Sequence, residues 1–230
     1  MHPLGNSLAN PVWHALGTVQ QHLNAGSQQL RFFAPDVAPF AGMENWDAAA
    51  LHHFEANIPA QRRMYLMQET PVIIPATLQV HLTVPLYQMI CVDFQPTFED
   101  YTLVPLTEEH IPQMLALTAL TKPGPFLAQT IQFGSYVGVF DGERLVAMGG
   151  ERLKVPGFTE VSAICTHPDY RGRHLARHIL SQVSQQIIHR GEVPFLHSLT
   201  TNEPALKVYQ QLGYRLNRHI FFAIVEKQSG

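Results

Sequence analysis

Residues 160–176 read EVSAICTHPDYRGRHLA, and this stretch decides how the chain around it is organised. It begins with an apolar run, Val161 to Cys165, that is typical of a buried strand. The turn at residues 168–172 ends the strand and leads into a helix whose apolar face is formed by Leu175, Ile179, Val183 and Ile187. First-turn N–H groups of a helix lack backbone partners and lie at the positive end of its dipole, so the pattern predicts an anion site at residues 171–176.

Two further segments follow in a fixed order. Residues 194–197, Pro-Phe-Leu-His, have the composition of a strand. Asn202, Ala205 and Tyr209 then stand at helical spacing before Gly213-Tyr214, which begins another strand. The region therefore alternates strand, helix, strand, helix and strand.

In these segments the sequence resembles the GCN5-related N-acetyltransferase (GNAT) superfamily. The superfamily signature, Gln/Arg-x-x-Gly-x-Gly/Ala, is matched by Arg171 and Ala176, whereas His174 stands where the family usually has glycine. Glu160 precedes Arg171 by eleven residues, as in the histone-acetyltransferase members. The resemblance covers roughly residues 97–230 and is closest to the branch that includes the C-terminal region of glycine N-acyltransferases. It implies an α/β (α+β) fold in which helices flank a mixed central sheet.

The resemblance also implies which residues hold acetyl-CoA, the acyl donor of the family. The pyrophosphate would lie on the backbone N–H groups of Arg171, Gly172, Arg173, His174, Leu175 and Ala176, with the arginines adding charge. Ile164, Cys165 and Thr166 would bulge and pair with the pantetheine arm, and one amide there would polarise the thioester carbonyl. Asn202 and Ala205 complete the expected cofactor-binding set; the alternative for Asn202 is a simple helix cap.

Glu160 and Tyr209 are the expected catalytic residues. Glu160 would take the proton of the amine, although a glutamate at the solvated start of a strand fits the sequence equally well. His197, on the neighbouring strand, is the second candidate base. Tyr209 would protonate the departing thiolate, and its alternative is a core aromatic on an amphipathic helix. Cys165 has no evident cationic neighbour, which argues against a role as a nucleophile.

His174 is the residue that departs from the family pattern. Glycine at this position lets the backbone approach the phosphates without an intervening Cβ. Histidine is compatible with it if its φ is helical and its ring points outward. The imidazole could then either donate to a phosphate or weaken cofactor binding.

Composition narrows the class of protein. The 230 residues are 46% hydrophobic and 14% charged, which favours a globular fold over disorder. The net charge of −3, with neither half strongly basic, argues against nucleic-acid binding. Two cysteines cannot form a disulfide framework, and the thirteen histidines show no metal-ligand spacing, so we expect no metal site. The start of the sequence has no export signal and no long apolar run follows, so a cytoplasmic location without membrane contact is expected.

The chain divides into two expected parts. Residues 1–96 form a small α+β accessory domain, with one helix from Pro11 to Gly26 and another from Ala48 to Asn57. Residues 78–84 alternate in polarity, which predicts a half-buried strand that pairs with residues 64–69; its buried face is Leu78, Val80, Leu82 and Val84. The apolar run at residues 85–92 is expected to join the common core.

Residues 97–230 form the second part, with the order β-α-α-β-β-β-α-β-α-β-β. Residues 108–120 are expected to be helical and to end at the Pro/Gly-rich stretch 121–125. Asp141-Gly142 predicts a hairpin between two apolar strands.

We therefore expect an N-acetyltransferase that moves an acetyl group from acetyl-CoA to a primary amine by direct attack in a ternary complex. The acceptor would be a small-molecule or peptide amine. The competing hypothesis is a non-catalytic acyl-CoA-binding module that keeps the fold, and His174 is the residue that supports it. A homodimer formed through the N-terminal part is a further possibility.

Overall fold

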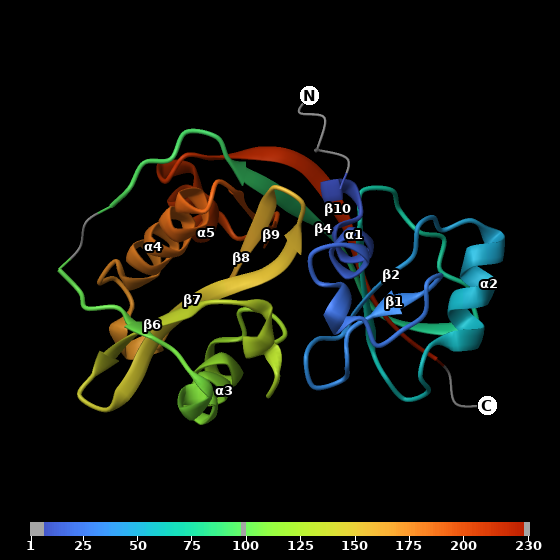
Figure 1. Cartoon of the computed structure of the whole chain (residues 1–230), viewed down its shortest axis with the longest axis horizontal. Helices are drawn as coiled ribbons and strands as arrows, with labels where there is room; N and C mark the ends of the chain where they lie inside the picture. Colours follow the sequence, from blue (N-terminus) through green and yellow to red (C-terminus); the bar gives the residue numbers. More distant parts are fainter. Residues whose placement is uncertain (1–6, 98–99, 228–230) are drawn as a thin grey trace.

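The computed structural model describes residues 7–97 and 100–227, and its backbone is organised by one mixed sheet (Figure 1). In the described residues the strand order is β1-β2-β3-β10-β4-β9-β8-β7-β6-β5. The pairs β2–β3 and β8–β9 are parallel and the other neighbours are antiparallel. The strands are β1 (Arg31–Phe32), β2 (Phe40–Gly42), β3 (Met64–Gln68), β4 (Leu78–Cys91), β5 (Val104–Pro105), β6 (Tyr136–Asp141), β7 (Arg144–Val155), β8 (Phe158–Thr166), β9 (Val193–Leu199) and β10 (Tyr214–Lys227). The predicted mixed sheet is thus confirmed.

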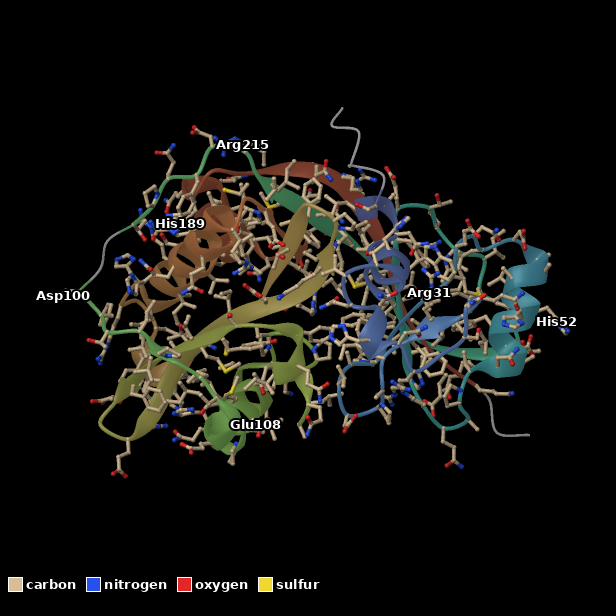
Figure 2. The ribbon with its side chains drawn as sticks, viewed as in Figure 1. Arg31, His52, Asp100, Glu108, His189 and Arg215 are labelled. Atoms are coloured by element: carbon tan, nitrogen blue, oxygen red, sulfur yellow. The ribbon has the colours of Figure 1, made fainter. Side chains whose placement is uncertain are left out.

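Helices cover both faces of this sheet. They are α1 (Pro11–Gly17), α2 (Ala48–Asn57), α3 (Ile111–Thr121), α4 (Leu175–His189) and α5 (Glu203–Gln211), with 3-10 turns η2 (Gln21–Leu23), η3 (Glu108–His110), η4 (Thr130–Phe133) and η5 (Pro168–Tyr170). In Figure 2, Glu108 before α3 lies on the opposite side of the central strands from His189 at the end of α4. The predicted apolar face of α4 is confirmed, because all four of its residues are at most 3% exposed.

The C-terminal strand joins the two halves of the chain. β10 lies between β3 and β4 and pairs antiparallel with both. The expected pairing of residues 64–69 with residues 78–84 is therefore wrong, because the last strand of the chain occupies the position between them. The C-terminal part of β4, from Leu86 to Ile90, also pairs with β9, as expected for a run that joins the common core. The division of the chain at residue 96 stays a prediction.

The first helix is shorter than its sequence pattern suggests. α1 ends at Gly17, and Val19, expected on the apolar face, is 46% exposed. The reason is the side chain of Gln20, which is buried against β7. Its Nε2 donates to the carbonyl of Arg152 at 2.8 Å and its Oε1 accepts from the N–H of Lys154 at 3.0 Å. These two hydrogen bonds of the Gln20 side-chain amide hold the chain against β7 and end the helix.

β4 forms as predicted, but the predicted burial of one face is wrong. Leu78 is buried, whereas Val80 is 48% and Leu82 is 39% exposed. Alternation in sequence identifies a strand face that is apolar. It does not show whether a second layer covers that face. A register shift in the pairing with β10 falls between Val80 and Leu82, and only Leu82 and Val84 of the four residues line a hollow.

The C-terminal half follows the expected order with two corrections. The β6–β7 hairpin is confirmed and turns at Gly142, whose φ is +58°. The second expected helix is only the 3-10 turn η4, and the last two expected strands are one strand, β10, with register shifts along its pairing to β4. The first five residues, which bear on the absence of an export signal, lie outside the described residues. No helix in the described chain is long and apolar enough to span a bilayer.

Candidate active site

The main cleft opens where β8 and β9 separate. The two strands pair only from Phe158 to Glu160 and from Val193 to Phe195. Beyond these pairs β9 bonds to β4, and residues 161–166 of β8 bond only to β7 within the described sheet. About half of the N–H and C=O groups of this part of β8 therefore face the gap without a strand partner. The cleft measures about 720 Å³.

Most of the sequence-predicted cofactor residues line this cleft. They are Ile164, Cys165, Thr166, Arg171, Gly172, Arg173, His174, Leu175, Ala176 and Asn202, together with Tyr209. Ala205 and Glu160 are not among the lining residues. Asn202 is exposed and begins α5, but its side chain makes no capping hydrogen bond.

The strand on one wall bulges, as the family resemblance implies. Between the pairs Cys165–Met148 and Ser162–Gly150, β8 has two residues where β7 has one. The extra residue is accommodated at Ala163, whose φ is +56°. A bulge turns successive backbone groups out of the ladder and toward the cleft. Close by, the buried Oγ1 of Thr166 has no hydrogen-bond partner among the described residues.

The loop before α4 presents its amides to the same cleft. Gly172 and His174 both have positive φ, +77° and +61°. In the described residues, the N–H groups at positions 172–174 donate to no acceptor, and those of the first turn of α4 lack helical partners. Alternating backbone conformations of this kind form a concave cluster of N–H donors that binds anions.

The loop is also anchored from outside. The Arg173 guanidinium lies 4.8 Å from the centre of the Tyr170 ring, and the Tyr170 hydroxyl donates to Asp141 at 2.5 Å. Arg173 forms no salt bridge with the residues that the structure describes, so its guanidinium group lies near the donor cluster without a carboxylate partner.

The conformation of His174 differs from the one that its sequence position was expected to require. A helical φ was expected, but the residue is left-handed, with φ +61° and ψ +10°, and serves as the N-cap of α4. A side chain in this region is strained because Cβ approaches the following carbonyl. The usual glycine of the family signature fits this backbone without strain.

Glu160 is fully buried and lies behind the cleft, which excludes the solvated position considered from the sequence. Its Oε2 accepts from Nε of Arg152 at 2.8 Å, and its Oε1 accepts from Nη2 of Arg152 at 2.5 Å. Nδ1 of His197 lies 2.6 Å from the same Oε1. The arrangement is a bidentate ion pair with a histidine on its second side.

This contact network continues through the sheet. The Nε2 atom of His197 lies 3.0 Å from Nε2 of Gln88 on β4. The Gln88 amide also donates to the carbonyl of Leu8 and accepts from Asn217 on β10. Since the Gln88 nitrogen can only donate, Nε2 of His197 accepts, and Nδ1 carries the proton toward Glu160. Both ring nitrogens of His197 are therefore engaged in this network.

The charge state of Glu160 follows from these partners. Burial alone would raise its pKa, but the charge and hydrogen bonds of Arg152, with the hydrogen bond from His197, outweigh burial and lower the pKa to about 2. Glu160 is therefore a carboxylate at neutral pH and a weak base. Sequence reasoning missed Arg152 and Gln88; the one local signal is a charged or amide residue inside an otherwise apolar strand.

Tyr209 and Cys165 have environments that separate their roles. Burial raises the pKa of the Tyr209 hydroxyl, and a hydrogen bond with Ser198 partly opposes this, so the phenol is protonated at neutral pH. Burial raises the pKa of the Cys165 thiol to about 11. A thiol with so little thiolate is a poor nucleophile, in agreement with the expectation from its sequence neighbours.

A second hollow adjoins the main cleft. We call it the apolar hollow; it measures about 810 Å³ and lies between the C-terminal part of α3, with the loop that follows, and one face of β3, β10 and β4. It shares five lining residues with the main cleft, namely Lys122, Pro123, His197, Ser198 and Leu199. Two separate molecules, one in each cavity, would meet at these shared residues.

Comparison with known proteins identifies the family to which this chain belongs. Residues 136–223 match the model of the family described as FR47-like protein. A solved structure from Novosphingobium aromaticivorans DSM 12444, assigned to the GNAT family of acetyltransferases, is 36% identical over 96% of this chain and 99% of that one, with a TM-score of 0.90. The chain belongs to the GNAT family. No curated protein matches the sequence.

More distant structures share the GNAT fold alone. A GCN5-related N-acetyltransferase from Kribbella flavida has a TM-score of 0.64 at 16% identity, over 96% of this chain and 97% of that one. A tandem GNAT protein from the clavulanic acid biosynthesis pathway has a TM-score of 0.53 at 12% identity, over 87% and 79%. The GNAT acetyltransferase fold predicted from residues 160–214 is thus confirmed.

The ion pair of Glu160 predicts a specific acid response. Because its folded pKa of about 2 lies below the ordinary value of 4.5, the carboxylate stabilises the fold fully above pH 4.5, and this contribution is lost as pH falls toward 2. Glu160→Gln leaves Arg152 buried without its charge partner and should lower the free energy of unfolding at pH 7 by about 3 kcal/mol. Urea unfolding at a series of pH values should show this difference shrinking below pH 4.5.

The control for this experiment is Glu69→Gln. The ion pair of Glu69 with Arg218 is half exposed on the glutamate side, so its removal should cost under about 1 kcal/mol at pH 7. Equal losses in the two variants would show that the buried ion pair contributes no more to the free energy of unfolding than the exposed one.

His174→Gly should stabilise the protein by about 1 kcal/mol, because glycine relieves the left-handed strain. It should also tighten acetyl-CoA binding, since the Cβ is removed from the N–H cluster. Gln61→Gly is the matched control: Gln61 has φ +56° and lines neither cavity, so it should stabilise the fold without changing binding. Thermal unfolding and calorimetric titration measure both effects, and weaker binding by His174→Gly would show instead that the imidazole donates to the ligand.

Proposed function

We propose that this GNAT protein transfers an acetyl group from acetyl-CoA to a primary amine by direct attack in a ternary complex. One observation carries the proposal: the main cleft, with its row of free amides, meets the apolar hollow at shared lining residues. A donor and an acceptor bound in these cavities would have their reactive atoms side by side. Holding two reactants in contact removes much of the entropic barrier of a bimolecular step.

The residues of the main cleft fit acetyl-CoA. The N–H cluster at residues 172–176 and the guanidinium groups of Arg171 and Arg173 would hold the pyrophosphate. The open edge of β8 from residue 161 to residue 166 would pair with the amides of the pantetheine arm. The unpartnered Oγ1 of Thr166 adds a polar group that a ligand can satisfy. Acetyl-CoA supplies an activated thioester.

The same strand edge supports the attack. An N–H group held by the bulge at Ala163 would donate to the carbonyl oxygen as negative charge develops on it. Such a donor is fixed by the β7–β8 ladder before the substrate arrives. Its orientation therefore costs nothing at the moment of reaction.

The environment of the apolar hollow favours the neutral amine over the ammonium ion. Glu160 and His197, the two bases expected from the sequence, are both engaged in the buried network. Arg152 and Lys122 line the hollow, and nearby positive charge together with burial disfavours an ammonium ion. The amine then enters in its neutral form. The proton that its nitrogen loses as the amide bond forms would pass to solvent water in the cleft, and water would return a proton to Tyr209 after the thiolate leaves. Glu160 acts through Arg152 and His197 as a positioning residue.

Tyr209 is the proposed acid. Its hydroxyl is protonated at neutral pH and lies in the main cleft, where it would donate a proton to the departing thiolate. Ser198 contacts the hydroxyl from β9 and orients it. The assignment to the glycine N-acyltransferase branch and a cytoplasmic location remain part of the proposal.

Binding and turnover test the proposal together. Acetyl-CoA at a hundredfold excess over its dissociation constant should stabilise the protein by about 2.7 kcal/mol. Tyr209→Phe should keep this stabilisation, because the ring still packs, and should lower kcat by about 10² to 10⁴. Thermal scans and free-thiol release measure the two quantities. A protein that binds acetyl-CoA but releases no thiol with any amine would be the non-catalytic module, and one without a thermal shift would refute donor binding itself.

A further inference from the structure

The apolar hollow has a wall made of apolar side chains from the sheet. Its floor is one face of three strands, with Tyr65, Met67, Leu82, Val84, Phe222 and Ile224 side by side across β3, β4 and β10. Phe126 and Leu127, from the loop after α3, lie on the opposite side. Leu82 is 39% exposed, although it points into this cavity. A cavity of about 810 Å³ with this lining favours a ligand with a large apolar body.

The charges around the hollow have one sign. Arg63, Lys122 and Arg152 line it, and no aspartate or glutamate is among its lining residues. Arg152 is paired with the buried Glu160, and Arg63 contacts Glu226 at 3.5 Å. An acceptor that carries several positive charges would meet cations here without a carboxylate to bind.

Lys122 is the cation left to bind a ligand. No ion pair or hydrogen bond of its ammonium group is made within residues 7–97 and 100–227. It ends α3 in a left-handed conformation, φ +52°, and lines both the main cleft and the apolar hollow. A free lysine at the junction of two cavities suits an anionic group on the acceptor.

We infer that the acceptor is an α-amino acid with a large apolar or aromatic side chain, bound with its carboxylate on Lys122 and its side chain in the apolar hollow. The amine and carboxylate of an α-amino acid are attached to one carbon. A carboxylate held by Lys122 therefore keeps the amine at the junction, next to the main cleft. The inference rests on the proposed function and names the substrate class of that site.

The first experiment compares acceptors in a free-thiol release assay with acetyl-CoA. Phenylalanine has the amine, the carboxylate and the large apolar side chain. Phenethylamine lacks the carboxylate, glycine lacks the apolar side chain, and spermidine is a polycation. We expect kcat/KM for phenylalanine to exceed that of each of the others by at least about fivefold, the scale of one partly exposed ion pair or a partial apolar contact. Spermidine or glycine as the best acceptor would overturn the inference.

Two variant pairs locate the contacts. Leu82→Thr should reduce kcat/KM for phenylalanine by about fivefold and leave that for glycine unchanged. Val80→Thr is its control, because Val80 is 48% exposed on the same strand and does not line the hollow. Lys122→Gln should abolish the preference for phenylalanine over phenethylamine. The control is Lys207→Gln, because Lys207 lines the main cleft but not the apolar hollow; it should leave that preference intact.

The acyl chain of the donor is the other molecule that could fill the hollow. If octanoyl-CoA replaces acetyl-CoA with a large gain in kcat/KM, and Leu82→Thr removes that gain, the hollow binds the acyl chain and the inference fails. The thermal shift with acetyl-CoA separates this failure from failure of the proposed function. A protein that binds acetyl-CoA and acetylates other amines retains the function and loses only the acceptor class.

Discussion

The structure depends on the buried carboxylate of Glu160 and the two side chains that hold it. Glu160 belongs to the last parallel pair between β8 and β9, so it lies at the point where those strands begin to separate. Arg152 reaches it from β7 and His197 from β9. A sheet that opens at this point loses backbone hydrogen bonds between β8 and β9, and the side-chain network replaces them with charge-assisted ones.

The network also connects the two halves of the chain. Gln88 carries the contacts of His197 to Leu8 near the N-terminus and to Asn217 on the last strand. Gln20 adds a second connection, bonding the chain after α1 to β7 on both sides of Leu153. Buried polar groups that are fully satisfied specify one arrangement, because any shift leaves a donor or a charge without a partner. The opening between β8 and β9 therefore has a fixed shape before any ligand binds.

The sequence predicted those parts of the molecule that rest on local patterns. The apolar face of α4 and the Gly142 hairpin follow from spacing and turn chemistry, and both are confirmed. The predicted anion-binding residues 171–176 line a cleft, and their role stays a prediction. The insertion of β10 between β3 and β4 could not be predicted from the sequence, because pairing between distant strands leaves no local signal. Arg152 was missed for the same reason: its role depends on a carboxylate eight residues away on the next strand. The left-handed backbone of His174 could not be predicted, because residues other than glycine seldom adopt a positive φ.

The incorrect expectation for β4 explains how the two halves share one site. Alternation in residues 78–84 predicted a face buried by the N-terminal part itself, yet Leu82 and Val84 line a cavity whose other side comes from the loop after α3. The loop and strand edge of the main cleft come from residues 121–211, whereas most of the floor of the apolar hollow comes from residues 39–86 and from β10. Changes in the N-terminal strands can therefore alter the hollow without disturbing the N–H cluster before α4. Under the proposed function, the N-terminal half would thus be part of the substrate-binding surface, and choice of acceptor and binding of donor would vary independently.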